Sequence, residues 1–110
     1  MYLPHHFEDT DPQAVRDIIE SCPLATLVVS ASTGLAANHI PVIADGAHAM
    51  IGHVAAANDL HRTVDDGAPV LLICSGEDSY ISPNWYPTKP QHHQHVPTWN
   101  YQVVHIHGRI

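Results

Sequence analysis

The sequence predicts a mainly β fold, a small antiparallel barrel that carries only short helices. Its 110 residues suffice for one modest hydrophobic core and are too few for two. Runs of branched apolar residues recur at short spacing between turn residues, which favours six antiparallel strands over a doubly wound sheet. Only two segments have the pattern of a helix, and both are brief. We therefore expect a single domain over residues 1–110.

The first element is a helix over residues 12–21. Asp11 suits the N-cap, Pro12 suits the first helical position, and Pro23 stops the segment. One face of this helix holds the apolar residues Val15, Ile18, Ile19 and Cys22. The segment is therefore amphipathic.

Three strands follow. Residues 24–30 are rich in branched side chains, which predicts a central strand that is buried on nearly both faces. Residues 35–43 and 48–54 predict an antiparallel pair, because Ala-Asp-Gly at 44–46 between them is a hairpin signal. Pro41 removes one donor from the ladder, so we expect an edge strand or a bulge there.

A second short helix is predicted after the third strand. Asn58 can cap it, Leu60 and Val64 lie four residues apart on one face, and Gly67 is a natural terminator. Two acidic residues, Asp65 and Asp66, end this segment and have the wrong charge for a helix C-terminus.

The second half of the chain predicts another hairpin and a last strand. Residues 68–74 and 79–82 have strand character on either side of a turn signal at 75–78. Residues 83–98 hold four prolines and predict an ordered loop. The final strand covers about 99–107, with Tyr101, Val103, His105 and His107 on one face and Val104 and Ile106 on the other.

Charge and composition exclude several protein classes. The net charge of −7 repels phosphate backbones, which argues against a basic DNA-binding face. The start lacks a signal peptide, no Asn-x-Ser/Thr site occurs, and the two cysteines form no CxxC motif. The apolar run between Glu20 and Asp45 is broken by prolines and a glycine, which favours strands over a membrane helix. We expect a soluble, cytoplasmic protein that does not enter a membrane.

Motifs of common catalytic folds are missing. No two glycines lie two residues apart, which excludes GxGxxG and GxSxG, and no GxxxxGK[ST] occurs. Cys22 and Cys74 each end an apolar segment, where a thiol usually packs as a small hydrophobe. No catalytic residue is therefore assigned.

The eleven histidines allow a metal-binding interpretation. His105 and His107 share one strand face, and three more lie nearby in sequence, at positions 92, 93 and 95. Against this interpretation, no HExxH or paired-cysteine spacing is present, and surface histidines need no metal. We assign no metal ligand and keep a His-based metal protein as a third hypothesis.

The segment over residues 52–62 has features of an anion site. Small residues let a ligand approach the backbone, and helix N–H groups together with His61 and Arg62 suit a phosphate. The alternative is an ordinary strand-to-helix turn capped by Asn58. Asp59 counts against an anion, because it already occupies the positive end of the helix dipole.

Aromatic residues gather in the stretch over residues 80–101. It holds both tryptophans, Trp85 and Trp99, and three of the four tyrosines. Flat rings beside Asn and Thr can wall a heterocycle, and the same rings can also simply pack in a core or loop. The sequence leaves both interpretations open.

At these residues the chain resembles the PaiB family, FMN-binding negative transcriptional regulators with a flavin-reductase-like split barrel. The resemblance depends on three blocks and spans nearly the whole chain: MYLPHHF, GHVAAANDLHR, and GEDSYISPNWYPTKPQHHQHVPTWNYQVVHIHG. Family members carry a proline where Asp59 stands and often a large aromatic at His61, which weakens the phosphate assignment. They also continue past Ile110, so we expect residues 1–110 to be an N-terminal portion.

The resemblance implies a homodimer with FMN in a groove between subunits. Mapped onto this chain, it implies Asn58, His61 and Arg62 for the phosphate. For the ribityl chain or the ring, it implies His39, Ile40 and His53. Trp85 and Trp99 would lie beside the ring or at the interface.

The resemblance implies a regulatory module, and the runner-up is a flavin-dependent oxidoreductase or flavin reductase. No nicotinamide fingerprint occurs, which favours sensing over catalysis. No helix-turn-helix or basic arm is visible, so DNA control would need a C-terminal part or another protein, and we expect no DNA binding by this chain alone.

Overall fold

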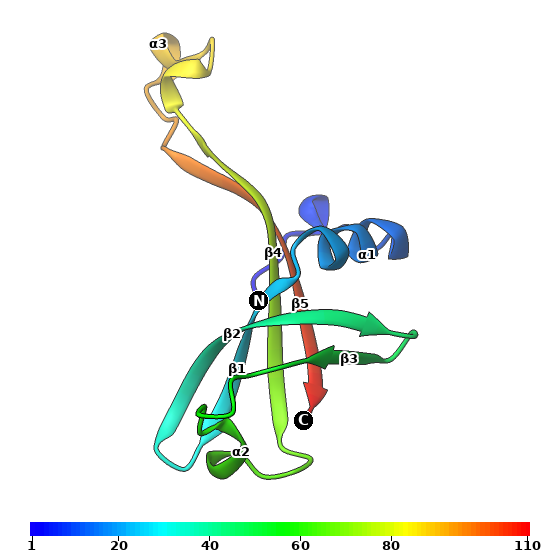
Figure 1. Cartoon of the computed structure of the whole chain (residues 1–110). Coiled ribbons are helices and arrows are strands. Elements are labelled where there is room, and N and C mark those ends of the chain that lie inside the picture. Colours follow the sequence, from blue (N-terminus) through cyan, green and yellow to red (C-terminus); the bar gives the residue numbers. More distant parts are fainter.

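The computed structural model describes all of residues 1–110 and is mainly β, as predicted. Five strands form one antiparallel sheet in the order β3-β2-β1-β4-β5 (Figure 1). The strands are β1 (Leu24–Ala31), β2 (Gly34–Asp45), β3 (Ala49–Gly52), β4 (Pro69–Ile81) and β5 (Thr98–Arg109). The helical elements are η1 (His5–Phe7), α1 (Pro12–Ser21), α2 (Leu60–Thr63), η2 (Pro83–Trp85) and α3 (Lys89–His92).

Helix α1 has the predicted bounds, and local chemistry explains them. The Asp11 carboxylate accepts a hydrogen bond from the Gln13 backbone N–H at 2.9 Å, and Pro12 occupies the first turn. Ile18 and Ile19 pack against the buried core, so the apolar face identified in the sequence is the face that contacts the sheet.

The core lies on one face of the sheet. Strand β1 alternates along its length, with Ala25, Leu27 and Val29 buried and their neighbours more exposed. The other members of this buried cluster are Ile40, Val42, Leu60, Leu72 and Cys74. A strand that is buried on both faces was therefore the wrong expectation for residues 24–30.

Strands β2 and β3 form the predicted hairpin, with Asp45 opposite Ala49. The expected edge at Pro41 holds locally, because residues 34–41 of β2 pair with β1 alone, and no bulge is present there. Pro41 is tolerated because it stands at a change of partner. It ends the pairing with β1 opposite Leu24, and pairing with β3 begins at Val42.

The predicted second hairpin at residues 75–78 is wrong. Residues 69–81 form one continuous strand, β4, which pairs with β5 along its whole length. The turn signal marks a β-bulge, because the register shifts between Ser75 and Asp78. A Cβ atom on Gly76 would lie 2.9 Å from the Gln102 Oε1 atom, so a residue without a side chain suits this position in the bulge.

Beyond the bulge, β4 and β5 leave the body of the molecule as a hairpin arm, defined here as residues 76–103 (Figure 1). Its tip, residues 82–97, holds η2 and α3, so the predicted ordered loop is confirmed. The molecule measures 58 × 33 × 23 Å, and its radius of gyration is 18.0 Å, against about 13 Å for a compact chain of this length.

The sheet is split-barrel-like and does not close into a barrel. No helix has both the length and the apolar character needed to cross a membrane.

Candidate functional site

The segment between β3 and α2 lies close to the backbone of β2. A Cβ atom on Gly52 would approach Ile40 Cδ1 at 3.1 Å and the Pro41 carbonyl oxygen at 3.2 Å. The chain then runs through small residues into α2, where Leu60 is buried in the core. Leu60 therefore anchors the helix, and the next two side chains, His61 and Arg62, are exposed.

Asn58 connects this segment to the sheet. Its amide nitrogen donates to the Asn38 Oδ1 atom at 2.9 Å, and its Oδ1 atom accepts from the Leu60 backbone N–H at 2.9 Å. The structure places the N-cap at Asp59, whose side chain forms no capping bond, so the predicted cap at Asn58 is off by one residue; Asn58 instead accepts from the first helical N–H, from the position before the cap. Its bond to Asn38, twenty residues earlier on β2, had no sequence signal.

His61 and Arg62 lie on the exposed side of α2. Neither side chain forms an ion pair or a hydrogen bond within the chain, so both remain able to bind an anion. The helix is only four residues long, and Asn58 already uses one of its N–H groups. An anion here would therefore depend on these two side chains more than on a helix dipole.

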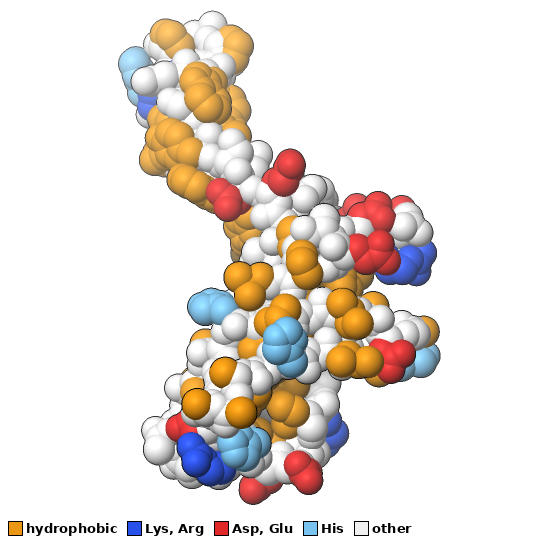
Figure 2. Space-filling model, viewed as in Figure 1, with side chains coloured by type: hydrophobic (Ala, Val, Ile, Leu, Met, Phe, Trp, Pro, Cys, Tyr) orange, Lys and Arg blue, Asp and Glu red, His pale blue; other side chains and the backbone are white.

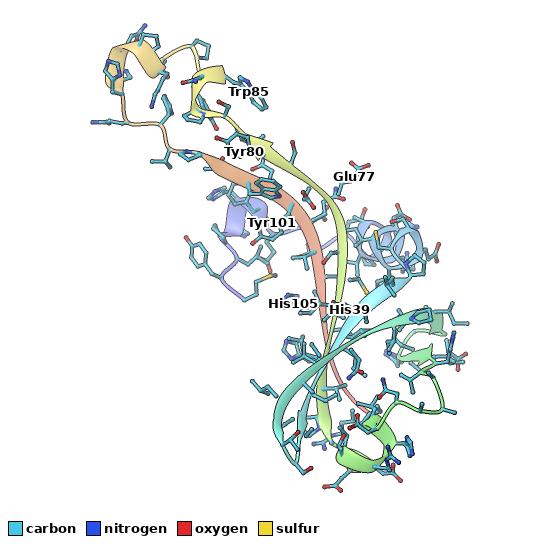
Figure 3. All side chains as sticks on the ribbon, turned by 60° about the vertical axis from the view of Figure 1, so that its left-hand side comes forward. His39, Glu77, Tyr80, Trp85, Tyr101 and His105 are labelled. Atoms are coloured by element: carbon cyan, nitrogen blue, oxygen red, sulfur yellow. The ribbon has the colours of Figure 1, made fainter.

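One predicted cofactor residue, His39, lies on the sheet face opposite the core. Strand pairing places His39, Thr26, Ile73 and His105 in one row across β2, β1, β4 and β5. The His39 Nδ1 atom lies 3.0 Å from the Thr26 hydroxyl oxygen, and this bond holds the ring near the sheet. Figure 3 shows His39 and His105 in this part of the body. Leu24 and Leu35 on this outer face are exposed.

Ile40 and His53 occupy different environments. Ile40 follows His39 on β2, so its side chain points to the opposite face and is buried in the core. His53 is exposed immediately after β3 and precedes the segment that leads to α2. His53 is thus accessible to a ligand, whereas the Ile40 side chain supports the sheet beneath one.

The predicted tryptophans lie on the hairpin arm, away from α2. Trp99 lies opposite Tyr80, one pair before the strands end at the tip; its indole N–H donates to the Asp78 carboxylate at 2.9 Å, and its ring lies 5.8 Å from that of Tyr80. Trp85 is at the tip and is exposed (Figure 3). One chain therefore does not bring Trp85 together with Arg62 or His39.

The tip has an internal structure that the sequence analysis missed. The His95 ring stacks on Tyr86 with ring centroids 4.5 Å apart, and its Nε2 atom lies 2.7 Å from the Thr88 hydroxyl oxygen. The Lys89 ammonium donates to the His95 carbonyl oxygen at 3.0 Å. These contacts join the two ends of the tip, Tyr86 to Lys89 on one side and His95 on the other.

No group of three or more His, Cys, Asp or Glu side chains is arranged to hold a metal ion. The two cysteines are free thiols. Burial raises the pKa of the Cys74 thiol above its ordinary value of 9.0, and the nearby Cys22 raises it further. Cys74 is therefore a neutral core residue at neutral pH, as the sequence predicted.

Comparison with known proteins gives a consistent result. A family model described as a putative FMN-binding domain matches residues 1–110. The chain is 31% identical, over 130 aligned residues, to an uncharacterized protein of Saccharomyces cerevisiae, covering 98% of this chain and 76% of the yeast protein. It is also 31% identical, over 112 residues, to protease synthase and sporulation protein PAI 2 of Bacillus subtilis. That alignment covers 99% of this chain and 52% of the Bacillus protein, so the chain spans about half of that relative.

Proposed function

The chain belongs to the PaiB-type family of putative FMN-binding domains, and from this premise we propose that it binds FMN as a homodimeric regulatory module. The observation that carries the proposal is an outward-facing pair of basic side chains, His61 and Arg62, on a turn that Asn58 and Leu60 hold rigidly against the sheet.

The phosphate of FMN fits this turn. The Arg62 guanidinium has no carboxylate partner in the chain, so it can form charge-assisted hydrogen bonds to phosphate oxygens. Asn58 positions the turn, and the small residues before it leave the backbone open to a ligand. The carboxylate of Asp59 next to this site weakens the attraction but does not occupy the guanidinium.

The remainder of the cofactor would lie along β2 and the end of β3, against His39, His53 and the backbone around Ile40. Trp85 and Trp99 lie on the hairpin arm, so a site or an interface that includes them draws them from a second copy. This separation within one chain supports a groove between two subunits. FMN, when bound, supplies a ring that can exchange electrons, and the chain's residues hold and shield it.

A regulatory role agrees with the charge of the chain. With a net charge of −7, these residues do not provide a surface for DNA, so control of transcription would act through another part of the protein or through a partner. We further propose that residues 1–110 constitute one split-barrel domain, because α1, α2 and the body strands contribute to one buried cluster.

A fluorescence titration with FMN and with riboflavin tests the proposal. Riboflavin lacks the phosphate, so the protein is expected to bind FMN at least tenfold more tightly, and Arg62→Ala is expected to remove most of that preference. Equal affinity for the two flavins would refute the phosphate assignment. An absence of quenching by both would refute flavin binding.

A further inference from the structure

The chain exposes more surface than a stable monomer of its size. Its accessible surface is 8317 Å², whereas a folded monomer of 12.0 kDa exposes about 6,000 Å². The surplus of about 2,300 Å² exceeds the roughly 800 Å² that each partner commonly buries in a stable complex. Only eight residues are buried, so much of the apolar surface requires a cover that the chain does not supply itself.

The tip of the hairpin arm is basic and apolar. No Asp or Glu occurs after Asp78, so the tip has no negative side chain; it holds Lys89 and three histidines, at positions 92, 93 and 95. Lys89 has no carboxylate within 4.0 Å. Trp85 and Val96, also in the tip, are 66% and 65% exposed, respectively.

The base of the arm has the complementary character. An apolar groove of about 820 Å³ lies there, lined by the N-terminal segment with Tyr2 and Phe7, by α1, and by β5 from Trp99 to Val104. Asp9 and Asp17 line it, and Figure 2 shows acidic side chains gathered over α1. The carboxylates of this region are Glu8, Asp9, Asp11, Asp17 and Glu20, and none of them pairs with a lysine or an arginine.

A chain cannot fill its own groove with its own tip. The continuous pairing of β4 with β5 up to Ile81 and Thr98 holds the tip at the far end of the molecule (Figure 1). We propose that two copies lay their arms antiparallel about a twofold axis, so that the tip of each arm enters the groove at the base of the other. The inference is based on the proposed homodimer and does not depend on FMN.

A twofold arrangement forms both contacts at once, because each copy offers one tip and one groove. It pairs Lys89 with the carboxylates of residues 8–20 and covers Trp85 and Val96 with the apolar groove. Within one chain, neither Lys89 nor these carboxylates form a lysine–carboxylate ion pair. In the dimer, the positive and the negative groups neutralise each other.

The single lysine of the chain makes the arrangement testable by zero-length carbodiimide cross-linking, which joins an amine to a carboxylate in direct contact. A mixture of unlabelled and nitrogen-15 chains separates links between copies from links within one copy. We expect mass spectrometry to find Lys89 joined to a carboxylate in residues 8–20 of the other copy. An interchain link from Lys89 to any other carboxylate, or a dimer without a Lys89 link, would overturn the arrangement.

Variants provide a second readout by light scattering over a dilution series. Lys89→Glu is expected to raise the dimer dissociation constant at least tenfold, whereas Lys89→Arg keeps the charge, leaves the constant nearly unchanged and removes the cross-link. Replacing residues 82–97 by Asn-Gly, a two-residue turn that preserves the β4–β5 hairpin, is expected to give a monomer with an unchanged strand spectrum in circular dichroism.

These outcomes separate the two proposals. A wild-type chain that is monomeric at all concentrations would refute both the homodimer and the arm exchange. A dimer that Lys89→Glu leaves intact would overturn the arm exchange alone, and FMN binding is measured independently of both.

Discussion

Replacing Asn58 by alanine is expected to destabilise the chain and to loosen the turn that holds Arg62. The substitution removes two hydrogen bonds at once, the one that Asn58 accepts from the Leu60 N–H and the one that it donates to Asn38. Loss of each side-chain hydrogen bond costs about 0.5–1.5 kcal/mol. We therefore expect Asn58→Ala to lower the free energy of unfolding by about 1–3 kcal/mol.

Asn58→Asp separates the two bonds. The carboxylate retains an acceptor for the Leu60 N–H, but it has no amide donor for Asn38, so its expected cost is only about 0.5–1.5 kcal/mol. Asn84→Ala is the matched control, because Asn84 is exposed on the arm and its side chain forms no hydrogen bond. The expected order of destabilisation is Asn58→Ala, then Asn58→Asp, then the control.

Urea unfolding followed by circular dichroism, at one fixed protein concentration, measures these differences. The reasoning is refuted if Asn58→Ala lies within about 0.5 kcal/mol of Asn84→Ala, or if Asn58→Asp costs as much as Asn58→Ala. A double-mutant cycle with Asn38→Ala isolates the long-range bond, and we expect a coupling energy of at least about 0.5 kcal/mol.

Three further predictions concern the cofactor, the thiols and DNA. Arg62→Ala is expected to weaken FMN binding by about 1.5–3 kcal/mol, with a smaller loss for Arg62→Lys and none for Arg16→Ala in the same fluorescence titration. A disulfide reagent such as DTNB should modify half-exposed Cys22 in the folded protein and Cys74 only after unfolding. Rapid labelling of both thiols in the folded protein would contradict the burial of Cys74. Because the folded state keeps the Cys74 proton to higher pH, that thiol's contribution to stability is complete below its ordinary pKa of 9.0 and is lost as the pH rises through the folded-state pKa. The chain alone is expected not to bind promoter DNA specifically at pH 7.5 and physiological salt, and saturable, sequence-dependent binding in a titration would disprove this.

Local chemistry made part of this protein predictable from its sequence. The bounds of α1 follow from Asp11 and Pro12, because caps depend on backbone groups within a few residues. The same local chemistry predicts a side-chain bond from Asn58 at the start of α2, although the N-cap itself is Asp59. The faces of β5 follow from alternation alone, and Val104 and Ile106 do pack against the core.

The tertiary structure decided what depends on distant partners. Residues 75–78 have the composition of a turn, but pairing with β5 along the whole of β4 makes them a bulge in one long strand. The same pairing carries Trp85 away from Arg62, and the bond between Asn58 and Asn38 joins residues that sequence alone does not bring together. Turn and cap preferences act over a few residues, whereas the pairing of strands depends on the burial of a whole face. Local sequence patterns therefore could not predict where the arm lies.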